Sequence, residues 1–118
     1  MIKAERIGDR ILKVVAPTKL RSGDFAELAR QVEPLIRQGG QFRLLIDASD
    51  LAGWNDLAAL EEHAAFVKSH QQKVDRIAVI AAHEWQRWLI GAVKVFLHPH
   101  VRLFEKSHEG EALDWLKS

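Results

Sequence analysis

The chain has 118 residues, with 17 basic and 16 acidic side chains mixed along the sequence and a formal net charge of +1. This balance excludes a basic stripe for a nucleic-acid backbone, and the absence of cysteine excludes disulfides and thiolate chemistry. A chain of this length can bury enough surface to fold as one domain over residues 1–118 without a metal or a cofactor. No secretory hydrophobic segment follows Met1, and no apolar run approaches the roughly 20 residues that span a bilayer, so we expect a cytoplasmic protein.

Two short β-prone runs open the chain. We predict strands over residues 2–7 and 10–15. The residues between them, Gly8 and Asp9, form a pair that is typical of a two-residue hairpin turn. The first two strands are therefore expected to be antiparallel.

An amphipathic helix is predicted next. Ser22 is placed to cap its start, and Gly39-Gly40 is expected to end it. Pro34 removes one internal hydrogen bond and should kink the helix. Its apolar residues recur at the helical spacing and are Phe25, Leu28, Ala29, Val32, Leu35 and Ile36.

The remaining chain alternates apolar runs with helical patterns. Strands are predicted over residues 42–48, 76–82 and 101–105. Helices are predicted from Asp56 to Gln72, from Glu84 to Leu97, and from Ser107 onward. The order ββαβαβαβα predicts an α/β domain with a mostly parallel five-stranded sheet, flanked by helices, in which the first strand is antiparallel.

The second helix is expected to be capped by Asn55 or Asp56. The residues expected on its buried face are Leu57, Leu60, Ala64 and Val67.

The helix predicted to end at Leu97 is too apolar for an ordinary surface helix. The stripe expected to face the core is Trp85, Trp88, Leu89, Ala92, Val93 and Phe96. Ile90, Val95 and Leu97 then lie outside that stripe, so a polar replacement of Ile90 or Leu97 should cost little stability. A second subunit, a membrane surface or an apolar ligand is expected to contact the surplus apolar face. Arg87 and Lys94 lie on its polar strip, where they either meet anionic headgroups or simply face solvent.

Six segments support a resemblance to a known family by their order and spacing. They are Leu44–Asp47, Gly53-Trp54, Arg76–Val79, Trp85, Arg102–Phe104 and Glu111–Leu116. The chain resembles the SpoIIAA-like family, and its element order is similar to that of the STAS domain of anti-sigma-factor antagonists. The family's fold is also compared with lipid-binding CRAL-TRIO domains. The resemblance covers almost the whole chain and implies a STAS-like single domain.

The phosphorylated serine of those antagonists has no clear counterpart here. In that family it lies in an Asp-Ser-Ser-Gly motif at the start of the second helix, and this motif is missing. Ser49 lies several residues before the helix, and a phosphate on it would meet Asp47 and Asp50. We therefore favour an ordinary turn serine over a phosphorylation switch.

The six histidines do not predict a metal site. His63 and His70 are expected on one helix, separated by roughly 10 Å along its axis, which is too far for a shared ion. His98 and His100 flank a proline and have no third ligand nearby in sequence. The chain also lacks a phosphate-binding loop, a nucleophile elbow and paired carboxylates, so we do not expect an enzyme.

Two tryptophans are expected at the carboxyl edge of the sheet, where α/β proteins bind ligands. Trp54 and Trp85 follow neighbouring strands, so their rings either frame a mouth there or, in the case of Trp54, close a loop onto the core. We hypothesise a non-catalytic domain that binds an apolar or lipid-like small molecule, with a membrane surface as one setting. The alternative is a protein-interaction module that forms a homodimer or docks a regulatory partner.

The candidate ligand-binding residues are Trp54, Trp85, Trp88, Leu89, Ile90, Val93 and Leu97. The candidate partner or membrane surface comprises Arg87, Ile90, Lys94 and Leu97.

Overall fold

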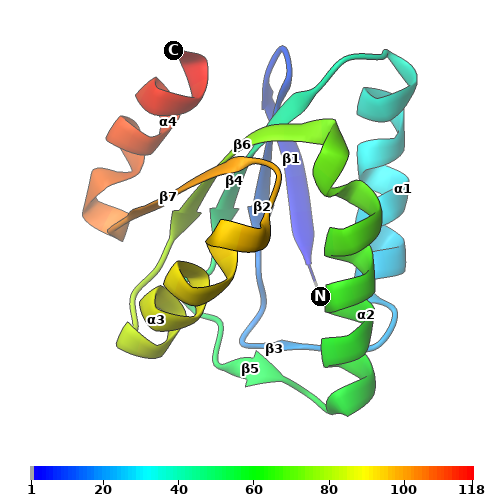
Figure 1. The fold of residues 1–118 in the computed structure, drawn as a ribbon, viewed down its shortest axis with the longest axis vertical. Helices are drawn as coiled ribbons and strands as arrows, with labels where there is room; N and C mark the ends of the chain where they lie inside the picture. The colour runs from blue at the N-terminus through cyan, green and yellow to red at the C-terminus, as the bar shows by residue number, and fades with distance from the viewer. Residues whose placement is uncertain (1) are drawn as a thin grey trace.

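The computed structural model describes residues 2–118 and contains a five-stranded sheet in the order β1-β2-β4-β6-β7 (Figure 1). Its strands are β1 (Lys3–Gly8), β2 (Ile11–Val15), β4 (Phe42–Asp47), β6 (Val74–Ile80) and β7 (His100–Phe104). Strand β1 is antiparallel to β2, and every other neighbouring pair is parallel. The predicted strands and their directions are therefore confirmed.

The helices also follow the predicted order. Within the described residues they are α1 (Asp24–Arg37), α2 (Leu57–His70), α3 (Glu84–Val93) and α4 (Glu109–Lys117). Three short 3-10 turns flank them, η1 (Gln71–Lys73), η2 (Lys94–Phe96) and η3 (Lys106–His108). The sequence did not predict a small parallel pair formed by β3 (Lys19–Leu20) and β5 (Gly53–Trp54).

At two glycines, the β1–β2 turn and the cap of α1 differ from the positions predicted from sequence. Gly8 still pairs with Ile11 beside a bulge, so the hairpin turn lies one residue later than predicted. Helix α1 is capped by Gly23, so the prediction of Ser22 as its cap was wrong. Gly23 has a φ of 94°, a left-handed conformation that serine rarely adopts.

The alternation of side chains along the strands creates two cores. Helices α1, α2 and α3 contribute to one core, and α4 contributes to the other. The residues of the five-stranded sheet in the first core are Ala4, Leu12, Val14, Phe42, Leu44, Ile46, Val74, Ile77, Val79, Val101 and Leu103. Those in the second are Ile7, Ile11, Leu45, Ala78, Ile80 and Phe104. Both faces of the central strands are covered, which explains their nearly continuous apolar sequence.

Helix α2 turns a different face to the core from the predicted one. Leu57 and Leu60 are 67% and 41% exposed, whereas Ala59 is fully buried and Phe66 packs against the core. Aromatic contacts determine this rotation, because His63 stacks on Phe25 of α1 with ring centroids 4.8 Å apart. The inward face predicted from sequence was therefore wrong for Leu57, Leu60 and Ala64, which are exposed, whereas Val67 is half-buried. Asp56 caps the helix as one of the two predicted candidates, accepting a hydrogen bond from the Ala59 amide.

Candidate binding surface at the carboxyl edge of the sheet

The side chain of Gln86 fixes α3 to the ends of two strands. Its Nε2 donates to the carbonyl oxygens of Ala48 (2.7 Å) and Leu51 (2.8 Å), in the loop after β4. Its Oε1 accepts from the backbone amides of Ala82 (2.9 Å) and His83 (3.2 Å), in the loop after β6. Gln86 is only 4% exposed. Its buried amide group therefore forms hydrogen bonds with backbone groups of both loops, and these bonds determine which side of α3 faces the sheet.

This rotation places the apolar residues of α3 outside the core. Trp88, Val95 and Phe96 are 74%, 74% and 81% exposed, and Trp85 and Val93 are also exposed. We call these five residues the α3 apolar surface. The predicted inward stripe was therefore wrong for most of its members, because the sequence pattern gave no weight to the polar Gln86.

The other candidate residues on this helix are more deeply placed. Ile90 packs against the first core, contrary to its predicted position outside the core-facing stripe. Leu89 and Leu97 are half-buried, and Arg87 and Lys94 are exposed. A polar replacement of Ile90 is consequently expected to destabilise the fold.

Trp54 and Trp85 lie side by side, as their positions after neighbouring strands predicted. Their ring centroids are 6.4 Å apart in an edge-to-face arrangement. Trp54 also packs against the first core, and its Nε1 donates a hydrogen bond of 3.0 Å to Nδ1 of His63. An aromatic chain thus connects α2, β5 and the start of α3.

His63 is neutral in this chain of contacts. Burial lowers the pKa of its imidazole below the ordinary value of 6.5. Since Nδ1 accepts the Trp54 hydrogen bond, the single ring proton lies on Nε2. Protonation of Nδ1 would remove the acceptor that holds the Trp54 indole.

Lys106 completes a polar cluster that the sequence did not predict. The Asp47 carboxylate accepts hydrogen bonds from the Ser49 hydroxyl (2.5 Å), the Ser49 amide (3.0 Å) and Lys106 Nζ (3.0 Å). Burial raises the pKa of Asp47, but the hydrogen bonds from Ser49 and Lys106 outweigh it and hold this pKa below the ordinary value. The hydrogen bond to Asp47 raises the pKa of Lys106. The Ser49 hydroxyl is therefore committed to a turn around a buried carboxylate.

The predicted histidine pairs do not converge on a metal site. His63 stacks on Phe25, while His70 stacks on Phe66 with ring centroids 4.2 Å apart. His98 contacts Gln41 instead of His100. Within residues 2–118, no group of three histidine, aspartate or glutamate side chains is arranged to hold a metal ion.

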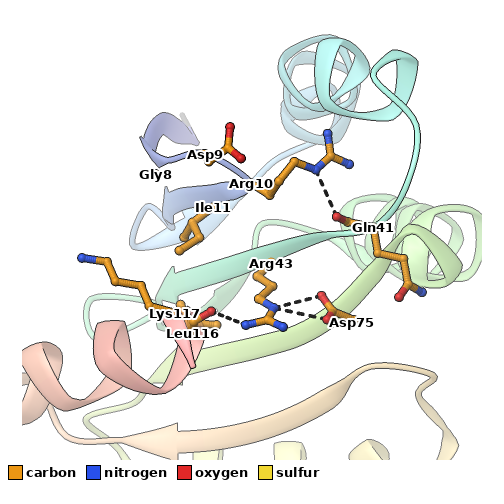
Figure 2. Close-up of a pocket in the computed structure, with 9 residues that line it drawn as sticks. All are labelled: Gly8, Asp9, Arg10, Ile11, Gln41, Arg43, Asp75, Leu116 and Lys117. Atoms are coloured by element: carbon orange, nitrogen blue, oxygen red, sulfur yellow. Dashed lines mark hydrogen bonds and ion pairs between the residues drawn. The ribbon is translucent and has the colours of Figure 1, made fainter.

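Two cavities lie in other parts of the structure. The larger has a volume of about 430 Å³ and opens between the β1–β2 turn, β4 and the end of α4. Figure 2 shows Arg43 in it, between Asp75 and the carbonyl of Leu116. The second, of about 340 Å³, lies over β6 and β7 beside Trp115. Neither is lined by a residue of α2 or α3.

Comparison with known proteins places this fold in a family. A family model described as SpoIIAA-like matches residues 11–117. A crystal structure of an uncharacterised protein with a SpoIIAA-like fold, from Shewanella loihica, is similar with a TM-score of 0.81 and 27% sequence identity. The similarity covers 98% of this chain and 92% of that one, and no curated protein matches this chain. No helix within residues 2–118 has the length and apolar character needed to cross a bilayer. The chain belongs to the SpoIIAA-like family.

Proposed function

We propose that this chain is a non-catalytic binding domain that docks on lipid through the α3 apolar surface. The observation that supports this is the exposure of three large apolar side chains on one short segment, Trp88, Val95 and Phe96. Contiguous apolar groups in water are typical of interaction sites, because leaving them exposed favours aggregation. The residues of α3 that stabilise the fold are others, Gln86 and Ile90.

The chemistry of the segment favours a lipid surface over an enclosed small ligand. Trp88 and Phe96 face outward, and neither cavity adjoins α3. Arg87 and Lys94 are exposed on the same segment, where their charges meet anionic headgroups while the aromatic rings enter the interface. Trp54 and Trp85 form the support on which the segment rests.

A protein partner, including a second copy of the chain, is the alternative that one observation favours. Leu57 is 67% exposed and Leu60 is 41% exposed on α2, outside the α3 apolar surface. A docking area that uses both helices has the breadth of a protein interface, since such interfaces combine an apolar centre with a polar rim.

Flotation with lipid vesicles tests the proposal. The wild-type chain should float with vesicles that contain anionic lipid and should float less with neutral vesicles. Phe96→Ser and Trp88→Ser should each weaken vesicle binding by about tenfold to a hundredfold, because a buried aromatic side chain contributes roughly 1.5 to 3 kcal/mol. Leu57→Ser is the matched control, since it removes an equally exposed apolar residue from α2.

The same variants decide between lipid and protein. Light scattering and native mass spectrometry of the purified chain report its subunit count and any bound lipid. A stable dimer that Phe96→Ser dissociates, with no flotation of the wild type, would overturn the lipid proposal in favour of the protein interface.

A further inference from the structure

Three cationic or titratable side chains form a row across the α4 face of the sheet. In the strand register, Arg43 of β4 pairs with Arg76 of β6, and Arg76 pairs with His100 of β7. Like charges directly opposite one another on a sheet are destabilising. Each guanidinium in this row therefore needs a negative partner.

The end of α4 supplies partners for part of the row. Arg43 contacts Asp75 at 3.2 Å and donates to the backbone carbonyl of Leu116 (Figure 2). It also donates to the backbone oxygen of Ser118. Arg76 donates through Nη1 to the Trp115 carbonyl at 2.7 Å. These carbonyls lie at the negative end of the helix dipole, which favours both arginines.

Arg102 has no such partner. Its backbone lies in strand β7, but its side chain forms no hydrogen bond and no ion pair with any residue in the described range 2–118. Its guanidinium instead lies over two aromatic rings, 5.2 Å from the centroid of Phe104 and 5.4 Å from that of Trp115. Arg76 lies over the same Trp115 ring at 5.2 Å. Stacking holds the plane of a guanidinium and leaves its in-plane N–H groups available to an oxyanion.

The cavity of about 340 Å³ joins these groups. Its lining residues are Arg76, His100, Val101, Arg102 and Trp115, with no carboxylate among them. The larger cavity differs, because its lining includes both Asp9 and Asp75 and its Arg43 is already committed. Of these two cavities, only the smaller one contains an arginine side chain without a hydrogen-bond partner, Arg102, and has no carboxylate in its lining.

We propose that the Arg76–His100–Arg102 cavity binds a single phosphoryl group, as inorganic phosphate or as a phosphate monoester. Arg102 donates its whole fork to the oxyanion, Arg76 donates the Nε and Nη2 protons that α4 does not use, and His100 supplies a further N–H. The site lies on the α4 face of the sheet, so it is independent of the α3 apolar surface.

Amide NMR spectra of the whole chain, titrated with inorganic phosphate, test the proposal. We expect saturable shifts that are confined to the segments around Arg76, His100 and Arg102. Arg102→Gln should weaken phosphate binding by about tenfold or more, because it removes a charged bidentate donor. Arg102→Lys should bind phosphate more tightly than Arg102→Gln but less tightly than the wild type, since lysine carries the positive charge without the bidentate guanidinium donors.

Arg21→Gln is the matched control, because Arg21 is an exposed arginine before α1 that belongs neither to this cavity nor to the α3 apolar surface. Equal weakening by Arg21→Gln and Arg102→Gln, or shifts that spread over the surface without saturating, would overturn the proposal. The Arg102→Lys variant keeps the test valid if Arg102→Gln fails to fold.

The source of the phosphoryl group is distinguished by two probes. Glycerol 3-phosphate represents a soluble monoester. Vesicles containing phosphatidic acid represent a lipid headgroup, and they are tested with Phe96→Ser so that the α3 apolar surface contributes little to binding. Binding of either probe that depends on Arg102 supports the site and identifies the source. If inorganic phosphate binds through Arg102 and neither probe does, the free anion is the ligand. Binding of phosphate or of either probe that does not depend on Arg102, or no binding of any of the three, overturns the proposal.

Discussion

Replacing Gln86 with methionine should detach α3 from the ends of β4 and β6. Methionine has a similar length and fills the same space, but it has no amide. The variant therefore removes four hydrogen bonds without creating a large cavity. The side chain is 4% exposed, so water has little access to the groups left behind.

The size of the stability loss depends on which backbone groups lose their last hydrogen-bond partner when Gln86 is replaced. The Ala48 carbonyl keeps a hydrogen bond of 3.0 Å from the Leu51 amide. The Leu51 carbonyl and the amides of Ala82 and His83, in contrast, depend on Gln86. An unsatisfied buried group costs about 1 to 3 kcal/mol, and partial access of water to the Ala82 loop reduces its share. We expect the free energy of unfolding to fall by about 2 to 4 kcal/mol.

Urea denaturation of Gln86→Met measures this change, and hydrogen exchange locates it. Exchange should accelerate at Ala82, His83 and along α3, with β2 and β4 less affected. Gln72→Met is the control, because Gln72 is exposed on η1. A loss of stability below about 0.5 kcal/mol, as at ordinary surface sites, would refute the assignment of Gln86 as the anchor of α3.

Three further predictions concern single side chains. Ile90→Ser should destabilise the fold by about 1 to 3 kcal/mol, while Val95→Ser should stay within about 0.5 kcal/mol in the same denaturation assay; equal effects would contradict the observed rotation of α3. Because the folded-state pKa of His63 lies below 6.5, stability should decline as the pH falls below that value, and His63→Asn, which still accepts from Trp54 but does not titrate, should reduce the decline between about pH 7 and pH 5. Ser49→Ala should raise the pKa of Asp47 in an NMR titration, since the hydroxyl stabilises the carboxylate, and an unchanged pKa would exclude that role.

The strands were predictable because their signals are local and redundant. The segments from Phe42 to Asp47 and from Ile77 to Ile80 are nearly continuous apolar runs. Such runs are typical of strands that are covered on both faces of a sheet. The alternation of strand and helix then leaves few topologies, because parallel crossovers share one hand. The small β3–β5 pair escaped prediction, since a two-residue strand has no periodicity to detect.

The polar clusters escaped prediction because their members are far apart in sequence. Lys106 reaches Asp47 across 59 residues, and Arg43 reaches Leu116 across 73. The arginines over Trp115 come from β6 and β7, and only the strand register places them together. A single sequence carries no signal for these contacts, so the cavity they line is visible only in the folded chain.

Helix α3 shows why an apolar pattern alone does not determine which face is buried. Periodicity selects a face only when the apolar residues are confined to one stripe, and here they surround most of the helix. Polar groups then determine which face of the helix is buried. Leaving buried carbonyls and amides without hydrogen bonds destabilises the fold more than exposing a valine side chain does. The Gln86 side chain forms hydrogen bonds with these loop carbonyls and amides from one side of α3. Ile90 lies one turn later on the same side of the helix and packs against the first core. The residues left outside include Trp88 and Phe96, which are 74% and 81% exposed. The burial of one glutamine thus fixes which apolar side chains of this segment face solvent, and the docking surface that we propose is built from those side chains.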